Sequence, residues 1–547
     1  MSGKKRLAYL VTFILISIAV LSPLSLPTPR SSDFMGFSAS RVASNIEYIS
    51  KEPHSIEHSE ARSRVRDYIA SRLSGMGLTP HYHHYDSVIN RFGDAMDIAN
   101  LYTKVEPLAG TADSYILFVA HMDSRFKTKV KDKYVYSYGA ADDGYGVAVI
   151  LELMNNLLNL SRNRSEWRQG IKILFTDSEE SGLEGMKSAL KYDPHVFENV
   201  NLVINIEARG VRGPALLFET SPGNSKLMEL YKEAKHPYTY SMTSVIYNIL
   251  PNSTDFSCVS KDIPGFNFSV IDNLNYYHTD LDNYDNISLR SIQHYGEQIL
   301  PIVKSYLVNN SYGDMKAFAS EEDLFFFTVP HIGIFSFKNS LLITLQYISL
   351  VVIMLSTLLF IAQRRASMKN ILKVTAINLL LLIVGAAAGY GISQLLAHIF
   401  GVKFSPVNLT YIKGEYIIIL SVLLLLYIMY VNIYRRFVKE GRSCSNIDFL
   451  SSGALLVTTV SIVSFYVLGD STLFWLPAVI SSLALLLNMF TFNKHTNYIG
   501  WCINLLYLLP LFYCLVMAVT IGALMLFIPL FLLYIAIQVP LSRQYYR

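Results

Sequence analysis

The stretch Tyr115-Ile-Leu-Phe-Val-Ala-His-Met-Asp-Ser124 decides the fold of the polar half of this chain. Six hydrophobic residues run directly into His-x-Asp, which is typical of a buried strand that ends in a polar turn. Similar β-rich runs follow at residues 171–176, 202–206, 215–218 and 265–270, with helical periods between them. Strands that alternate with helices predict an α/β domain, with a mostly parallel sheet flanked by helices.

The composition indicates that another part of the chain lies in lipid. Hydrophobic residues make up 52% of the 547 residues and charged residues only 16%, whereas soluble proteins carry about 25% charged residues. The net charge of +4 is small, and no basic tract is long enough to indicate nucleic acid. Only Cys258 of the four cysteines falls in the polar half, so we expect neither a disulfide framework nor a cysteine zinc site there.

Hydropathy divides the chain into four segments. Residues 1–31 are predicted to be a signal anchor, because Lys4, Lys5 and Arg6 precede an uncharged run long enough to cross a bilayer; a cleaved signal peptide is the alternative. Residues 32–312 form the polar α/β domain, and 313–340 are a linker. Residues 341–547 form an all-α multi-pass domain with about seven spans, at 341–362, 374–400, 416–434, 450–469, 472–492, 499–518 and 521–540.

Loop charges predict the orientation. The basic residues of alternate loops are Arg364, Arg365, Lys369 and Lys373, then Arg435, Arg436, Lys439 and Arg442, then Lys494, Arg543 and Arg547; the opposite loops hold only Lys403 and Lys413. With the N-terminus inside, this obeys the positive-inside rule and puts the polar domain on the non-cytoplasmic side. The N-x-[ST] triplets, at Asn159, Asn163, Asn252, Asn267, Asn286, Asn309 and Asn408, all fall on that side but do not distinguish a bacterial periplasm or cell surface from a eukaryotic vacuolar or endoplasmic-reticulum lumen.

Five short motifs in the polar domain carry candidate chemistry. They are His121-Met-Asp123, Gly139-Ala-Ala-Asp-Asp143, Ser178-Glu-Glu180, Asn205-Ile-Glu-Ala-Arg-Gly210 and Tyr277-His-Thr279 with Asp282 beyond it. Zinc prefers imidazole and carboxylate ligands, and the carboxyl ends of adjacent parallel strands meet at one crevice. Each motif alone is a weak indication, but five in order, each beside a strand, are hard to attribute to chance.

The set of motifs resembles that of the co-catalytic dizinc exopeptidases, which include bacterial leucyl aminopeptidase, aminopeptidase Y and glutamate carboxypeptidase II. The resemblance covers about residues 40–310 and implies the zinc exopeptidase fold. The attached membrane half is similar to the subgroup of the endoplasmic-reticulum metallopeptidase and the vacuolar membrane protease. Asn205-Ile-Glu-Ala-Arg-Gly210 and Pro251-Asn-Ser-Thr-Asp-Phe256 match that subgroup.

The resemblance implies two zinc ions per chain. His121 and Glu207 would bind one ion, Glu180 and His278 the other, and Asp142 would bridge both. Glu207 replaces the Asp of the soluble aminopeptidases, as it does in the membrane subgroup.

The resemblance also implies roles for residues around the ligands. Glu179 would be the general base, while Asp123 would hold the His121 ring and Asp143 would support the bridging turn. Tyr247 is a candidate for the oxyanion donor, with a core aromatic as the alternative. Arg209 fits either a substrate carboxylate or a structural ion pair.

Three functions compete for the whole chain. The leading one is a membrane-anchored zinc metallo-exopeptidase, an aminopeptidase acting on peptides with a free N-terminus. The second is a carboxypeptidase, or the one-zinc glutaminyl cyclase, on the same fold. The third is a membrane receptor or transporter with a vestigial peptidase domain, which an intact ligand set disfavours. No predicted span holds a charged residue, so we interpret the membrane half as an anchor that could also restrict substrate access.

Overall fold

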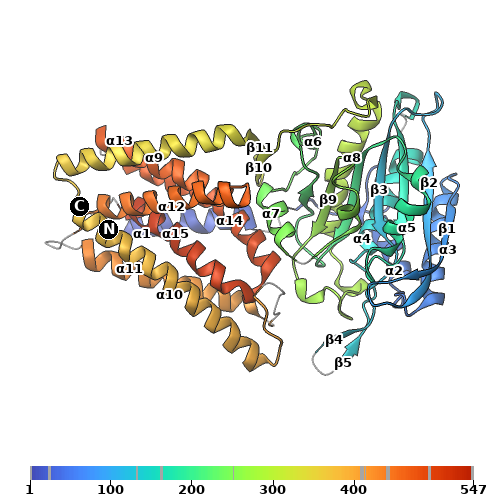
Figure 1. The fold of residues 1–547 in the computed structure, drawn as a ribbon, viewed down its shortest axis with the longest axis horizontal. Helices are drawn as coiled ribbons and strands as arrows, with labels where there is room; N and C mark the ends of the chain where they lie inside the picture. The colour runs from blue at the N-terminus through green and yellow to red at the C-terminus, as the bar shows by residue number, and fades with distance from the viewer. Residues whose placement is uncertain are drawn as a thin grey trace. The chain divides into compact units, whose positions relative to one another are not determined.

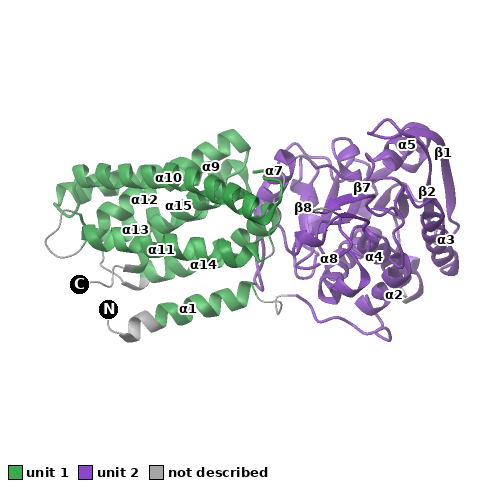
Figure 2. Ribbon diagram, turned by 90° about the horizontal axis from the view of Figure 1, so that it is seen from below, with its two compact units in different colours: residues 1–22, 337–547 green, residues 23–336 purple. Residues whose placement is uncertain are grey.

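A computed structural model of the chain describes residues 3–21, 26–130, 133–160, 164–250, 252–406, 412, 414–438, 444–490 and 494–543. It has two compact units, one of residues 23–336 and one of residues 1–22 with 337–547 (Figure 2). Of the residues singled out in the sequence, Asn163, Pro251, Asn408, Lys413, Lys439, Arg442 and Arg547 lie outside the described residues.

The polar unit is built on a seven-stranded sheet in the order β1-β2-β6-β3-β7-β9-β8 (Figure 1). Its strands are β1 (His81–Ile89), β2 (Ala95–Val105), β3 (Tyr115–His121), β6 (Gly170–Thr176), β7 (Val200–Ala208), β8 (Leu216–Thr220) and β9 (Gly265–Val270). The central strands β6, β3, β7 and β9 are parallel, whereas β1, β2 and β8 pair antiparallel with their neighbours. The predicted α/β class is confirmed, and the sheet is mixed because antiparallel strands complete both of its edges.

Two apolar cores cover the faces of this sheet. Ile116 and Phe118 of β3 lie in the larger core, and Leu117 and Val119 in the smaller one. The helices α2 (Ala39–Ile49), α3 (Ser59–Gly75), α4 (Gly144–Asn155), α6 (Ser225–Tyr231) and α8 (Leu289–Val308) contribute to the larger core, and α5 (Glu184–Tyr192) contributes to the smaller one. Because both faces are buried, the central strands are apolar at almost every position.

The carboxyl ends of the central strands bring the predicted motifs to one edge of the sheet. His121 is the last residue of β3, and Glu207 is the last but one of β7. Glu179 and Glu180 follow β6 directly, and His278 lies in the loop that follows β9. Parallel strands end at the same edge, so this arrangement follows from the strand order.

The other unit is all-helical. Its helices are α1 (Gly3–Leu21), α9 (Asn339–Ala362), α10 (Met368–Phe400), α11 (Glu415–Val438), α12 (Asn446–Leu468), α13 (Trp475–Phe490), α14 (Lys494–Val519) and α15 (Leu524–Arg543). Each of the seven predicted spans coincides with one of α9 to α15. Within the described part of the chain, six helices are long and apolar enough to cross a membrane, and α13 is shorter.

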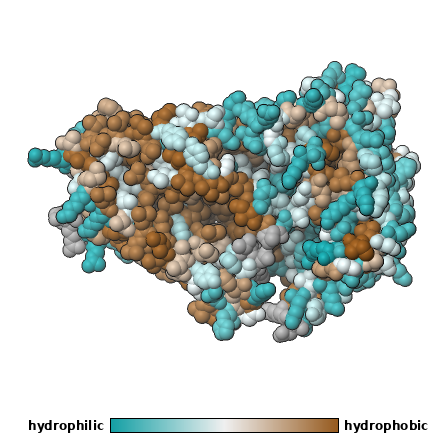
Figure 3. All heavy atoms as spheres, in the orientation of Figure 1, coloured by the Kyte–Doolittle hydropathy of each residue, from teal (hydrophilic) through white to brown (hydrophobic). Residues whose placement is uncertain are grey.

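The surface of the helical unit is largely hydrophobic (Figure 3). Ile417 and Val467, for example, are each 72% exposed. Soluble proteins rarely expose contiguous apolar surface of this kind, so the unit is a multi-pass membrane domain. Its buried acids among the described residues, Glu415, Asp448 and Asp470, lie at helix starts or in a loop, outside the predicted spans.

The stretch predicted as a linker, residues 313–340, contains regular structure. Leu324–Val329 (β10) and Gly333–Lys338 (β11) form a two-stranded sheet. Phe327 of β10 forms a bridge with Tyr240, just before α7 (Ser241–Ile249). A second small hairpin, β4 (Thr128–Val130) and β5 (Lys133–Val135), follows the His121 motif.

Candidate metal centre

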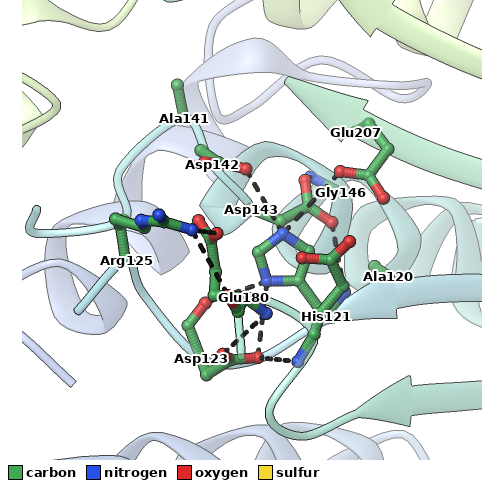
Figure 4. A network of polar contacts seen from close by, with 12 residues as sticks. Ala120, His121, Asp123, Arg125, Ala141, Asp142, Asp143, Gly146, Glu180 and Glu207 are labelled. Carbon is green, nitrogen blue, oxygen red and sulfur yellow. Dashed lines mark hydrogen bonds and ion pairs between the residues drawn. The ribbon is translucent and has the colours of Figure 1, made fainter. Parts of the chain in front are cut away.

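His121 is oriented by the backbone beyond it. Its Nδ1 lies 2.9 Å from the carbonyl oxygen of Asp123, and a carbonyl can only accept, so Nδ1 carries the proton. Nε2 is left to face Asp142 Oδ1 at 3.3 Å and Glu207 Oε2 at 3.7 Å. Figure 4 shows His121, Asp142 and Glu207 converging from three different segments. This is one three-residue group that could hold a metal ion.

A second group forms around His278. Its Nε2 lies 2.9 Å from Glu180 Oε1 and 3.2 Å from Asp142 Oδ2. The imidazole stacks on the ring of Tyr277, with ring centroids 3.6 Å apart. The two groups share Asp142. Its Oδ1 faces His121 and its Oδ2 faces His278.

The donor set fits zinc. A tetrahedral site with bonds of about 2.0–2.1 Å separates its ligand atoms by roughly 3.3 Å, close to the separations of 2.9–3.7 Å between these atoms. Asp142 Oδ2, Glu180 Oε1 and His278 Nε2 are buried and have no hydrogen-bond partner among the described residues. Buried polar atoms are normally satisfied, so three such atoms close to one another form a site that a cation would satisfy.

Asp123 ties two of the motifs together. Its carboxylate accepts hydrogen bonds from the backbone N–H of Glu179 at 3.0 Å and of Glu180 at 3.3 Å. Its carbonyl orients His121, while its carboxylate is 3.6 Å from the ring nitrogen. Asp123 therefore fixes the turn after β6 as well as the histidine at the end of β3.

Two further acids shape the Gly139–Asp143 turn. Asp143 caps α4 by accepting from Gly146 N at 2.9 Å, and it also accepts from His121 N at 3.3 Å. Asp282, quoted in the sequence without a role, accepts from the backbone N–H of Ala141 at 2.7 Å and of Asp142 at 3.3 Å. The turn that carries Asp142 is thus fixed by hydrogen bonds to two other acids.

The glycine at the start of this turn is required by space. Gly139 has a φ of +63°, and a Cβ on it would lie 2.9 Å from the Cβ of Ser124. Any larger residue would therefore push the turn away from the loop after β3.

Glu207 is oriented by a chain of side chains that crosses three strands. Asn205 donates to Glu207 Oε1 at 3.1 Å and to Asn267 Oδ1 at 2.9 Å. Asn267 in turn donates to Glu219 Oε2 at 2.9 Å. Asn267 is fully buried, so this N-x-[ST] triplet is inaccessible to glycosylation in the folded domain.

The concentration of carboxylates shifts their protonation. Burial raises the pKa of Glu207 to about 8, and the charges of Asp142 and Asp255 add to the rise. Burial also raises the pKa of Glu179 well above its usual value, helped by the charges of Glu207 and Glu180. A divalent cation favours the deprotonated carboxylates, so its binding here releases protons.

Glu180 has the opposite behaviour because it has cationic partners. Burial alone would raise its pKa, but His278 and Arg125 lower it well below the usual value. Arg125 Nη1 lies 2.8 Å from Glu180 Oε2 (Figure 4). The guanidinium also lies over the ring of Phe126, 4.1 Å from its centroid. Nothing in the sequence separated Arg125 from an ordinary surface arginine, apart from its place two residues after His-x-Asp.

Tyr247 and Arg209 lie beside this centre. Tyr247, on α7, is buried and packs edge-on against Phe218 with ring centroids 4.9 Å apart. Burial raises the pKa of its phenol, and the charges of Glu219 and Glu207 contribute. Tyr247 therefore lies within electrostatic reach of Glu207, although no hydrogen bond joins it to the ligands among the described residues.

Comparison with known proteins identifies the domain. The model of peptidase family M28 matches residues 100–303, a range that contains all the residues of the two metal groups. The mouse endoplasmic reticulum metallopeptidase 1 is 31% identical over 235 residues, which cover 42% of this chain and 25% of the mouse protein. The vacuolar membrane protease of Candida dubliniensis is 25% identical over 317 residues, covering 56% of this chain and 32% of the relative. The matched part thus spans only about a quarter to a third of these relatives.

Solved structures align with about half of the chain. A Zn-dependent exopeptidase from Parabacteroides distasonis has a TM-score of 0.39 and 18% identity, covering 49% of this chain and 98% of that one. A glutaminyl cyclase from Bacteroides thetaiotaomicron has a TM-score of 0.41 and 18% identity, covering 50% and 99%. Residues 100–303 therefore form a peptidase M28 domain, homologous to those of the endoplasmic-reticulum and vacuolar membrane proteins.

Proposed function

We propose, starting from the peptidase M28 domain at residues 100–303, that the chain is a two-zinc exopeptidase that removes N-terminal residues from peptides. The observation that carries this proposal is the pair of three-residue groups that share Asp142. A single bridging carboxylate between two imidazole–carboxylate pairs is the donor set of a dinuclear centre. The one-zinc glutaminyl cyclase reaction needs no such second group.

The ligands divide between two ions. His121 and Glu207 would hold one, Glu180 and His278 would hold the other, and Asp142 belongs to both groups. When bound, zinc polarises a carbonyl oxygen and lowers the pKa of a water molecule toward neutrality. Arg125 keeps Glu180 ionised through their 2.8 Å contact and leaves the other oxygen of that carboxylate facing His278.

Glu179 acts as the general base. Its backbone N–H is fixed by Asp123, next to the ligand Glu180, and its side chain is only partly buried. The raised pKa of Glu179 favours a group that accepts a proton from the attacking water and releases it to the leaving amine. Tyr247 is our candidate for the donor to the oxyanion, supported by its position near Glu207.

Peptides with a free N-terminus are the proposed substrates because the surroundings of the site are acidic. Asp255 and Glu219 are buried near the ligands, beyond the five ligands themselves. Such surroundings favour an ammonium group over a neutral amide. A carboxypeptidase is the second candidate, and the specific observation in its favour is Arg209, discussed below.

We also propose that the peptidase domain lies on the non-cytoplasmic side, with the helical unit as its anchor. The support is the placement of basic residues at the ends of helices. Arg364 and Arg365 follow α9, and Arg435 and Arg436 end α11, on the side that the positive-inside rule assigns to the cytoplasm.

The test compares free and N-acetylated peptides with the purified chain. Hydrolysis is expected only with a free α-amine; it falls to background with a strong chelator and returns when zinc is added. Equal cleavage of N-acetylated peptides would replace the aminopeptidase with a carboxypeptidase or an endopeptidase. A zinc-loaded chain without any hydrolysis would favour a receptor or transporter.

A further inference from the structure

Arg209 stands at the edge of the metal centre. It follows Glu207 by two residues, and its N–H continues the ladder with β9 by donating to Val270 O at 2.9 Å. Arg209 lies in the bend directly after β7, which brings it next to the end of the strand that carries Glu207.

Among the described residues, the Arg209 guanidinium has no carboxylate partner. Other shielded arginines of this unit are paired: Arg41 with Glu152, Arg62 with Asp177, and Arg125 with Glu180. No carboxylate of the described residues lies within 4.0 Å of Arg209, and its buried Nε has no hydrogen-bond partner among them. Arg209 is half-buried, and a partly shielded guanidinium without a carboxylate partner is suited to bind an anionic ligand.

Arg209 lies within electrostatic reach of the phenols of Tyr277 and Tyr247. Tyr277 stacks on His278, with ring centroids 3.6 Å apart. The charges of Asp142 and Glu180 act on its phenol as well as that of Arg209, so Tyr277 is in reach of both the second metal group and the guanidinium.

We propose that Arg209 binds a carboxylate of the substrate, on the residue that follows the scissile bond. A planar guanidinium matches a carboxylate with two parallel hydrogen bonds. One residue of chain spans about 3.8 Å between Cα atoms, so an α-carboxylate on that residue falls within a few ångströms of the reacting carbonyl. With cleavage after the N-terminal residue, an α-carboxylate at that position means that the substrates are dipeptides; an acidic side chain at the same position is the other source of the carboxylate.

The assignment rests on the proposed peptidase function, and the experiment separates the two. Hydrolysis of Leu-Ala is compared with that of Leu-Ala-amide, and hydrolysis of Leu-Glu-amide with that of Leu-Gln-amide, by the zinc-loaded full chain. An α-carboxylate gives a preference of about 30-fold or more in kcat/KM within the first pair, as expected for a desolvated charge pair. A side-chain carboxylate gives the preference within the second pair instead.

Arg209→Gln should abolish the preference by slowing only the carboxylate substrate, mainly through KM, with zinc content unchanged. Arg212→Gln, an exposed arginine three residues on, is the matched control and should keep it. An equal loss on all four substrates, no preference in the wild type, or a preference that survives Arg209→Gln would overturn the assignment.

Calorimetry can measure the same discrimination without turnover. The affinities of Leu-Ala and Leu-Ala-amide are compared in the Glu179→Gln variant and in the double variant Glu179→Gln/Arg209→Gln. Tighter binding of the acid that disappears with Arg209→Gln supports the carboxylate site even if the chain hydrolyses nothing. Equal binding of acid and amide contradicts it independently of the peptidase assignment.

Discussion

Replacing Glu179 by glutamine separates the proposed base from the proposed ligands. Glutamine keeps the size of the side chain and leaves the backbone N–H bond to Asp123 in place, but it cannot accept a proton at neutral pH. The five ligands are untouched, so the variant should bind two zinc ions like the wild type. Loss of a positioned acid–base group should lower kcat by about 10²–10⁴-fold, equivalent to roughly 3–5 kcal/mol of barrier.

Glu180→Gln should behave differently. It removes a charge that contacts Arg125 at 2.8 Å and His278 at 2.9 Å. Removing one partner of a buried pair costs about 3–5 kcal/mol of folding stability, and the second metal group loses its carboxylate. Zinc content, thermal stability and rate should therefore fall together. Asp142→Asn should lower the occupancy of both ions, because Asp142 belongs to both groups.

The assay measures zinc per chain by elemental analysis beside kcat for each variant, with Glu229→Gln as the control. Glu229 is an exposed helix residue paired with Lys232, and its replacement should change neither quantity. Near-full activity in Glu179→Gln, or loss of zinc as large as in Glu180→Gln, would refute the division of roles within the pair of glutamates.

Three further predictions address stability, the turn and topology. Asp282→Asn should weaken zinc binding by about 10–100-fold, as loss of a ligand's supporting partner usually does. The reason is that one of the two oxygens that accept from the Ala141 and Asp142 amides is replaced by a donor. Competition with a fluorescent chelator measures the zinc affinity, and an unchanged affinity would show that Asp282 does not support the site. Burial raises the pKa of Glu219 to about 7 from its ordinary 4.5, so its contribution to stability is present below about pH 4.5 and is lost as pH rises through 7. Relative to wild type, Glu219→Gln should therefore gain free energy of unfolding as pH rises from 5 to 8, by up to about 3 kcal/mol. Thermal melts of both proteins across this range measure the gain, and a constant difference would contradict the shift. Cysteine at exposed Ser74 should react with an impermeant reagent from the non-cytoplasmic side and cysteine at exposed Gln363 should not; labelling of both from one side would reverse the proposed orientation.

The strands that were predicted best from the sequence are those buried on both faces of the sheet. β3, β6, β7 and β9 are apolar on both faces, so their runs were visible, and their shared edge brought distant motifs together. β1 was not predicted because it is an edge strand whose residues, His-Tyr-His-His-Tyr-Asp at its start, are largely exposed. An edge strand of this kind carries no hydrophobic run or regular alternation to be detected.

The supports of the candidate site were harder to predict than the residues they hold. The roles of Asp282 and Asn267 depend on hydrogen bonds between residues more than 50 positions apart in the sequence. The double role of Asp123 depends on which atom faces the imidazole, the carbonyl or the carboxylate. Residue type and spacing carry no information on either, whereas three-dimensional contact does.

The hydrogen-bonded chain that joins Glu207 to Glu219 passes through two neutral side chains, Asn205 and Asn267. A change of charge at position 219, on β8, would therefore reach a proposed metal ligand through hydrogen bonds alone, with every proposed ligand left in place.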